Sequence, residues 1–262
     1  MQRNRIPIFQ VDAFAERLFE GNPAAVLILD EWLPEAVMQA IAGENNLAET
    51  AFARRNGPDW DLRWFTPTQE VDFCGHATLA TAHVLASAYG AGGDLRFRTR
   101  IGDLRVSPGE AGYRLDLPAF APEPAGDVHL PDGLLQEAPL SMFRNFENLY
   151  VELRDEEAVR GFIPDFERIA RLDPLGFVIT AAGKGHDFVS RCFFPAQGIP
   201  EDPVTGSAHA TLAPYWAGKL GKSRLSAFQC SSRGGHLSCE LAGERVFVEG
   251  KAITFLQGEV GL

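Results

Sequence analysis

The sequence predicts an α+β protein made of two similar lobes, each a mainly antiparallel β-sheet wrapped around one buried central helix. Three observations carry this prediction. A pair of short motifs occurs in the same order in both halves of the chain. Each second motif leads into a helix-like segment of small and apolar residues. The rest is dominated by short strand-like runs separated by turns, with 26 Gly and 17 Pro scattered through 262 residues.

The repeated motifs are F-x-P-x-Q and H-A-T-L-A. In the first half Phe65-Thr-Pro-Thr-Gln69 precedes Cys74-Gly-His-Ala-Thr-Leu-Ala80. In the second half Phe193-Phe-Pro-Ala-Gln197 precedes His209-Ala-Thr-Leu-Ala213 at a slightly different spacing. Chance can supply either string alone, but the same two strings in the same order indicate a duplicated lobe. We place the lobes at residues 1–118 and 119–262, joined near a proline-rich segment, with the last strand of the chain completing the first lobe.

The first lobe begins with strand-like residues 6–14 and 24–29, joined by the turn-like Gly21-Asn22-Pro23. Residues 34–44 have helical spacing of apolar positions, with the proline allowed in the first turn. Residues 76–89 are apolar nearly all round, which is typical of a buried helix. The other strands expected here are 49–53, 61–65, 95–99, 104–107 and 113–117.

The second lobe follows the same scheme. Its central helix is expected from about Ser207 to Ala217 and is again rich in small and apolar residues. Strands are expected before it at 149–153, 176–180 and 189–194, and after it at 225–229, 236–241, 245–248 and 253–256.

Composition excludes several classes of protein. A net charge of −11 and the lack of a basic stripe argue against nucleic acid as a partner. No apolar stretch approaches the roughly 20 residues that cross a bilayer, and the N-terminus lacks the pattern of a signal peptide. We therefore expect a cytoplasmic protein with no membrane partner. The histidines show no H-x-x-x-H or H-E-x-x-H spacing, so no metal is expected. The four cysteines, which lack the spacing of a disulfide scaffold, are Cys74, Cys192, Cys230 and Cys239.

Both central helices begin at a glycine, Gly75 in one lobe and Gly206 with Ser207 in the other. A helix start exposes free N–H groups and a partial positive charge, and glycine lets a ligand approach the backbone. Two such ends facing each other would hold a small carboxylate. The alternative is that these are ordinary helix starts, with Ser207 or Thr205 as the cap.

Three polar residues are candidates for the chemistry. Glu49 lies among small and apolar residues, where desolvation suits a carboxyl group to proton shuttling, although the spacing alone favours an exposed strand carboxylate. His76 could exchange protons or be structural, and Asp202 could orient a substrate or begin a turn. Cys74 could be a base with a lowered thiol pKa at a helix start, or a buried residue without reactivity.

Four segments together resemble one known family. FCGHATLATAHVL and EDPVTGSAHATL, preceded by GNPAAV and NLAETAF, are similar to the PhzF family of phenazine-biosynthesis-type isomerases, which shares the diaminopimelate epimerase fold. The similarity runs from Ile8 to the C-terminal strands. It implies a cofactor-independent, biosynthetic isomerase that forms a homodimer and binds a small carboxylated metabolite in the cleft between the lobes, an amino acid, a hydroxy acid or a cyclohexadiene-type compound.

The resemblance also implies residue roles. Glu49 matches the catalytic glutamate that moves a proton from one substrate carbon to another. His76 and Asp202 match residues that hold polar groups of the substrate and assist proton movement. Ser207, with the backbone of Gly75 and Gly206, matches the site of the substrate carboxylate. No metal, flavin or nicotinamide is implied.

The sequence departs from related enzymes in two places. Diaminopimelate epimerases use one cysteine at each helix start, whereas this chain keeps Cys74 but has Asp202-Pro203 in the second region. The segment 229–236 differs from the glycine-rich segment of phenazine enzymes, so Arg233 and His236 could alter the substrate. Two alternatives therefore stay open, a racemase or epimerase that uses Cys74 with Glu49, and a non-catalytic protein that binds a small carboxylate.

Overall fold

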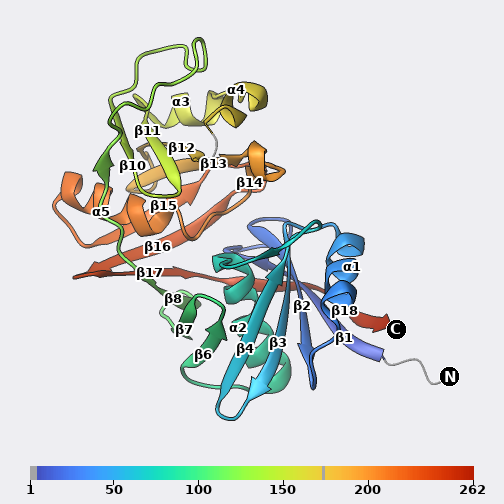
Figure 1. Cartoon of the computed structure of the whole chain (residues 1–262). Helices are drawn as coiled ribbons and strands as arrows, with labels where there is room; N and C mark the ends of the chain where they lie inside the picture. Colours follow the sequence, from blue (N-terminus) through green and yellow to red (C-terminus); the bar gives the residue numbers. More distant parts are fainter. Residues whose placement is uncertain (1–4, 173–174) are drawn as a thin grey trace. The chain divides into compact units, whose positions relative to one another are not determined.

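A computed structural model describes residues 5–172 and 175–262. The chain divides into two compact units (Figure 1). The first unit comprises Met1–Asp116 and Glu249–Leu262, and the second comprises Leu117–Val248. Among the described residues, no helix is long and apolar enough to cross a bilayer.

The first unit is a mixed sheet in which the last strand of the chain pairs with the first. Strand β18 (Ala252–Gly261) runs antiparallel to β1 (Arg5–Ala13), which in turn pairs with β2. Helix α1 (Glu35–Asn45) connects β2 to the parallel β3, and α2 (Gly75–Tyr89) connects β4 and β5 to β6. The remaining strands are β2 (Asn22–Leu29), β3 (Glu49–Asn56), β4 (Asp59–Phe65), β5 (Glu70–Val71), β6 (Leu95–Thr99), β7 (Gly102–Pro108) and β8 (Tyr113–Pro118).

Helix α2 is the buried centre of the first unit and packs against β1, β2 and β3 (Figure 1). All residues from Gly75 to Ala82 are buried, as are Val84 and Leu85, so the helix is covered on every face over its first three turns. It ends at Gly90, whose φ of 67° lies in the left-handed region that glycine adopts without steric cost. The start of the helix lies beside the first residues of β2 and β3, because His76 contacts Asn22 and Glu49.

The second unit repeats this plan with short additions. Helices α3 (Glu156–Gly161) and α4 (Phe166–Ala170) lie between the parallel strands β11 and β12, and α5 (His209–Leu220) lies between the parallel strands β13 and β15. The strands are β9 (Glu123–Pro124), β10 (Ser141–Arg144), β11 (Asn148–Glu152), β12 (Gly176–Ala182), β13 (Phe188–Phe194), β14 (Ile199–Asp202), β15 (Arg224–Gln229), β16 (Gly235–Ala242) and β17 (Arg245–Gly250), with one 3₁₀ turn, η1 (Pro195–Gln197).

The order of parallel and antiparallel pairs is the same in both units. Each has two parallel pairs, and each parallel pair is bridged by helix, because parallel strands need a crossover connection. Strands that follow each other through a short turn pair in antiparallel orientation. The α+β class with two similar, mainly antiparallel lobes around a buried helix is therefore confirmed, and the duplicated motifs lie at equivalent places, before and within α2 and α5.

Most expected elements are present with small changes at their ends. Helix α5 begins at His209 rather than Ser207, because Gly206–Ala208 form a turn with i to i+3 bonds before regular helix starts. The turn expected at Gly21-Asn22-Pro23 is shorter, since Asn22 and Pro23 already belong to β2. The short elements β5, β9, β10, β14, α3 and α4 were not predicted, because runs of two to six residues carry too little periodicity.

Candidate functional site

Glu49, Cys74 and His76 come together in the first unit. Glu49 is the first residue of β3 and pairs in register with Ala24 of the parallel β2, while His76 is the second residue of α2. One donor atom from each of the three side chains lies within 4.8 Å of the others. Segments about 25 residues apart in sequence thus meet at one end of the sheet.

The contacts around the His76 ring are close. Its Nε2 lies 3.2 Å from Glu49 Oε2, and its Nδ1 lies 3.1 Å from Asn22 Nδ2 and 3.5 Å from Cys74 Sγ. Glu49 is 8% exposed, Cys74 5% and His76 4%. Glu49 Oε2 is buried and makes no hydrogen bond within the described residues, so its approach to His76 is an ion-pair contact rather than an aligned hydrogen bond.

The titration of this group is set by burial and by mutual charge. Burial raises the pKa of the Cys74 thiol to about 11, and the nearby Glu49 carboxylate acts in the same direction. Burial opposes the charged form of His76, but negative groups at Cys74 and Glu49 hold its pKa well above the usual range. With a pKa of about 11, the Cys74 thiol stays protonated at neutral pH. The lowered thiol pKa considered for a cysteine at a helix start is therefore absent.

Gly75 is buried and is the first residue of α2. Cys74 occupies the N-cap position in an extended conformation, and no side chain caps the helix within the described residues. The first N–H groups of a helix have no intrahelical partner. The helix start thus adds a partial positive charge next to Glu49 and His76.

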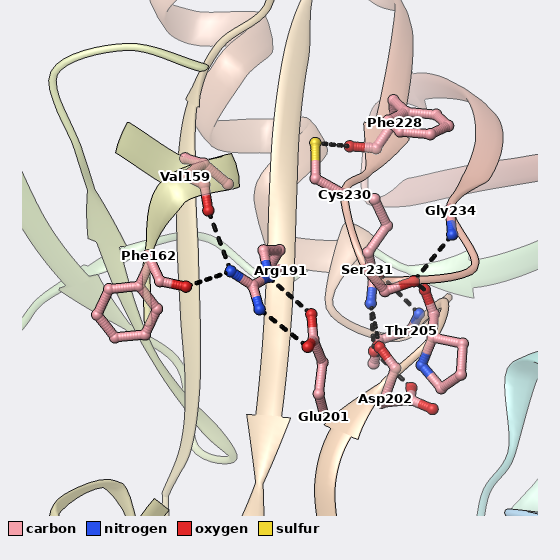
Figure 2. Close-up of polar contacts among 12 residues, drawn as sticks. Val159, Phe162, Arg191, Glu201, Asp202, Thr205, Phe228, Cys230, Ser231 and Gly234 are labelled. Carbon is pink, nitrogen blue, oxygen red and sulfur yellow. Dashed lines mark hydrogen bonds and ion pairs between the residues drawn. The ribbon is translucent and has the colours of Figure 1, made fainter. Parts of the chain in front are cut away.

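Asp202, Gly206 and Ser207 lie in the second unit. Asp202 ends β14 and accepts a hydrogen bond of 2.5 Å from the Thr205 hydroxyl (Figure 2). Gly206 is buried and Ser207 is half-buried in the turn that leads into α5. Neither Ser207 nor Thr205 caps the helix through its side chain, so the cap considered as an alternative is not formed.

Gln229 fixes the loop that carries Asp202. It is fully buried, its Oε1 accepts from the Thr205 N–H at 2.8 Å, and its Nε2 donates to the Asp202 carbonyl at 2.7 Å. The same Nε2 lies 3.2 Å from the Thr205 hydroxyl, which itself donates to Asp202. One amide therefore sets the backbone of the loop and, through Thr205, the orientation of the Asp202 carboxylate.

Arg191 anchors β14 from the other side (Figure 2). Its guanidinium donates hydrogen bonds of 2.7 and 2.9 Å to the two carboxylate oxygens of Glu201. Glu201 is the residue before Asp202 in the sequence. It also donates to the carbonyls of Val159 and Phe162 at the end of α3. Because Arg191 is only 8% exposed, this ion pair with its two parallel hydrogen bonds is shielded from solvent and holds β14 in place.

Sequence reasoning missed Asn22, Gln229 and Arg191. Asn22 had a signal, since it lies in the GNPAAV segment, but that segment suggested only a turn. Gln229 and Arg191 had none, because their roles depend on partners 10 to 32 residues away. His236, noted as a possible substrate determinant, contacts His186 at 3.2 Å and Phe228 within the second unit.

Comparison with known proteins gives one consistent result. Residues 11–258 match the protein family described as phenazine biosynthesis-like protein. A Pseudomonas aeruginosa protein named as an uncharacterized isomerase is 49% identical over 259 residues, 98% of this chain and 99% of its own. The crystal structure of a PhzF-family protein from Enterococcus faecalis has a TM-score of 0.95 at 48% identity, covering 99% of this chain and all of that one.

A more distant structure shares only the fold. A hydroxyproline epimerase from Agrobacterium vitis, with bound trans-4-hydroxy-L-proline, has a TM-score of 0.60 at 9% identity, covering 98% of this chain and 93% of that one. The fold therefore occurs both in relatives named isomerases and in an epimerase.

Proposed function

The chain belongs to the phenazine biosynthesis-like (PhzF) family, and we propose that it catalyses intramolecular proton transfer on a small carboxylated substrate, with Glu49 as the acid and base. The observation that carries the proposal is the Glu49 carboxylate. It is buried, one of its oxygens makes no hydrogen bond within the described residues, and it lies 3.2 Å from His76 Nε2.

This arrangement suits a mechanism in which a single carboxylate removes a proton from the substrate and returns it. Glu49 takes a proton from one substrate carbon and returns it to another, so the substrate changes only in the position of a proton and a double bond. No electrons are exchanged with a second molecule, and the step itself requires no redox cofactor. His76 lies within ion-pair distance of Glu49, and the start of α2 stabilises negative charge that develops on the substrate.

The remaining roles follow from the family resemblance. We propose that Asp202 holds a polar group of the substrate and that Ser207, with the backbone of Gly75 and Gly206, binds its carboxylate. The buried bonds from Thr205 and Gln229 support a positioned Asp202, because a group held in one orientation loses little entropy when it binds.

A second candidate is an epimerase that uses Cys74 with Glu49 as two bases. It is favoured by the position of the thiol, 3.5 Å from His76 at the start of α2. The pKa of about 11 speaks against it, since little thiolate exists at neutral pH.

The test is incorporation of solvent deuterium into a panel of small carboxylates, followed by mass spectrometry. The panel begins with dihydro-hydroxyanthranilate and continues with amino and hydroxy acids. The native protein should label one class, E49Q should not, and the exposed E44Q should behave as native. Equal labelling by E49Q would overturn the role of Glu49. A carboxylate that binds without labelling would favour the non-catalytic binding protein.

Iodoacetamide separates the two enzyme candidates. Because the Cys74 thiol is protonated and buried, we expect slow alkylation at neutral pH and no early loss of exchange. Rapid alkylation of Cys74, with loss of exchange at the same rate, would support the epimerase. Peptide mass spectrometry identifies which cysteine has reacted.

A further inference from the structure

Two histidines of the second unit that have no role in the proposed reaction bring their ring nitrogens together. His186 lies in the turn between β12 and β13, and His236 lies on β16. The Nε2 of His186 and the Nδ1 of His236 are 3.2 Å apart, and both residues are half-buried. They are 50 positions apart in the sequence, so no spacing motif predicts the pair. We propose that this pair of histidines binds one Zn²⁺ ion.

The distance between the two nitrogens suits two ligands of a tetrahedral ion. Zinc–nitrogen bonds of about 2.0 to 2.1 Å at the tetrahedral angle place two ligand nitrogens about 3.3 to 3.4 Å apart. The observed distance of 3.2 Å is close to this value. The pair can therefore accept the ion with little movement of either ring.

The two donors select the kind of ion. Neutral imidazole is a common ligand of Zn²⁺, whereas Mg²⁺ and Ca²⁺ prefer oxygen ligands. Two protein nitrogens leave two tetrahedral positions to water or to another small ligand. Cu²⁺ and Ni²⁺ also bind imidazole, but neighbouring ligands of a square-planar ion are only roughly 2.8 Å apart. The wider separation of 3.2 Å therefore favours Zn²⁺.

The protonation of the pair is compatible with a metal ion. Burial lowers the pKa of His186, and the nearby His236 acts in the same direction, so the His186 ring is uncharged at neutral pH. In the uncharged pair, one ring donates an N–H to the other. With the ion bound, both facing nitrogens give it their lone pairs, and each ring carries its proton on the other nitrogen. Binding to the uncharged pair thus changes a tautomer and releases no proton.

Both histidine rings are held in place by one aromatic side chain. Phe228 stacks on His186 with ring centroids 5.3 Å apart, and it contacts His236 with centroids 4.7 Å apart. His236 is also the direct partner of Phe228 in the pairing of β15 with β16. Because Phe228 packs against the core of the second unit, the two rings lose little freedom when they bind an ion.

The turn that carries His186 is fixed on both sides of that residue. The Lys184 N–H donates to Glu156 Oε2 at 2.7 Å, which ties the turn to α3. The Asp187 carboxylate accepts a hydrogen bond of 2.8 Å from the Ser226 N–H, which ties the turn to β15. The backbone at His186 is therefore already in position for the ion.

The charges around His186 neither attract nor repel a cation strongly. Three charged side chains lie close enough to influence the charge of its ring, those of Glu156, Arg160 and Asp187. Arg160 is paired with Glu156 at 2.7 Å, and Asp187 is paired with Lys222 at 2.5 Å. Since these charges cancel, the affinity for the ion has to come from the two imidazoles, and it requires both.

Binding of the ion does not depend on the proposed reaction, because neither histidine takes part in it. The experiment measures the bound ion and not the transfer of a proton. Failure of either proposal therefore leaves the other intact.

The test is a calorimetric titration with Zn²⁺ of the full, untagged chain at neutral pH, after treatment with EDTA. We expect the native chain to bind one Zn²⁺ at the pair. H186Q and H236Q should each weaken this binding at least about tenfold, because even an outer partner of a metal ligand contributes that much. H129Q is the matched control, since His129 is an exposed histidine of the same unit, and it should bind Zn²⁺ as the native chain does.

The comparison among these four proteins identifies the site, because zinc taken up elsewhere on the chain is the same in all of them. Circular dichroism checks that the variants are folded. H186Q guards against a folding defect in H236Q, since His186 lies in a turn and His236 in a strand. No Zn²⁺ bound by the native chain, or H186Q and H236Q affinities equal to that of the native chain, would overturn the proposal.

Discussion

At the scale of single residues, residue types could be predicted from the sequence, but the contacts between their side chains could not. Glu49 and His76 could be named as candidates from the sequence because they lie in motifs of a recognisable family. Their contact at 3.2 Å could not, because it depends on how α2 packs on β2 and β3. Asn22 and Gln229 escaped notice for the same reason, since an amide gains its role only when a distant partner is placed beside it.

Gln229 is predicted to support the Asp202 loop. Q229M keeps much of the side-chain volume but leaves the Thr205 N–H and the Asp202 carbonyl without their buried partners. We expect the free energy of unfolding to fall by about 1 to 3 kcal/mol in urea denaturation. Q136M, at an exposed position, should change it by less than about 0.5 kcal/mol. Equal stability of Q229M and the native protein would contradict the proposed support.

His209 makes stability depend on pH. It is fully buried, its Nδ1 donates to the Thr205 carbonyl at 2.8 Å, and its Nε2 makes no hydrogen bond within the described residues. Burial lowers its pKa from 6.5 to about 4, so the unfolded chain binds more protons than the folded chain between these values. The contribution of His209 to the free energy of unfolding is therefore at its maximum above pH 6.5 and is lost as the pH falls toward 4.

We expect this contribution to approach about 3 kcal/mol over that range, as measured by urea denaturation at several pH values. H209Q should be less stable at neutral pH but should show a flatter dependence on pH. H129Q, at an exposed histidine, should keep the native slope. If the free energy of unfolding of H209Q changes with pH as steeply as that of the native protein, groups other than His209 cause the pH dependence.

At the scale of elements, the central helices were the easiest to predict and their surroundings the hardest. The segment 76–89 became α2 almost unchanged, because a helix that is apolar all round leaves a strong pattern. The start of α5 was misplaced by two residues, because the turn at Gly206–Ala208 has no distinct composition. Strand β14 has only four residues and is held by its pairing with β13 and by contacts with Arg191 and Gln229, so no periodic pattern marked it in the sequence.

The burial of α2 predicts a contrast between two alanines of the same helix. Ala82 is fully buried against the sheet, whereas Ala88 is exposed near the C-terminal end. A82L should lower the free energy of unfolding by about 1 to 3 kcal/mol, because a close-packed interior has no room for the larger side chain. A88L should change it by less than about 0.5 kcal/mol. Similar effects at both positions would contradict the packing described for α2.

At the scale of the whole molecule, duplication explains why so much of the fold could be predicted. Two copies of one pattern give two chances to detect each strand, and the matched F-x-P-x-Q and H-A-T-L-A motifs fix the equivalence of the units. The last strand of the chain, β18, pairs with the first, β1. Substrate identity is not predictable in this way, because it depends on individual side chains rather than on the repeated plan.

The central claim is that Glu49 carries the proton. Its most direct test is the rate of solvent deuterium incorporation by E49Q, E44Q and the native protein, measured on the carboxylate that the native protein labels best. The account predicts a loss of about 10²- to 10⁴-fold for E49Q and no more than a twofold change for E44Q. An E49Q rate within about twofold of the native rate would contradict the account, because general acid–base catalysis by Glu49 could then supply no measurable part of the acceleration.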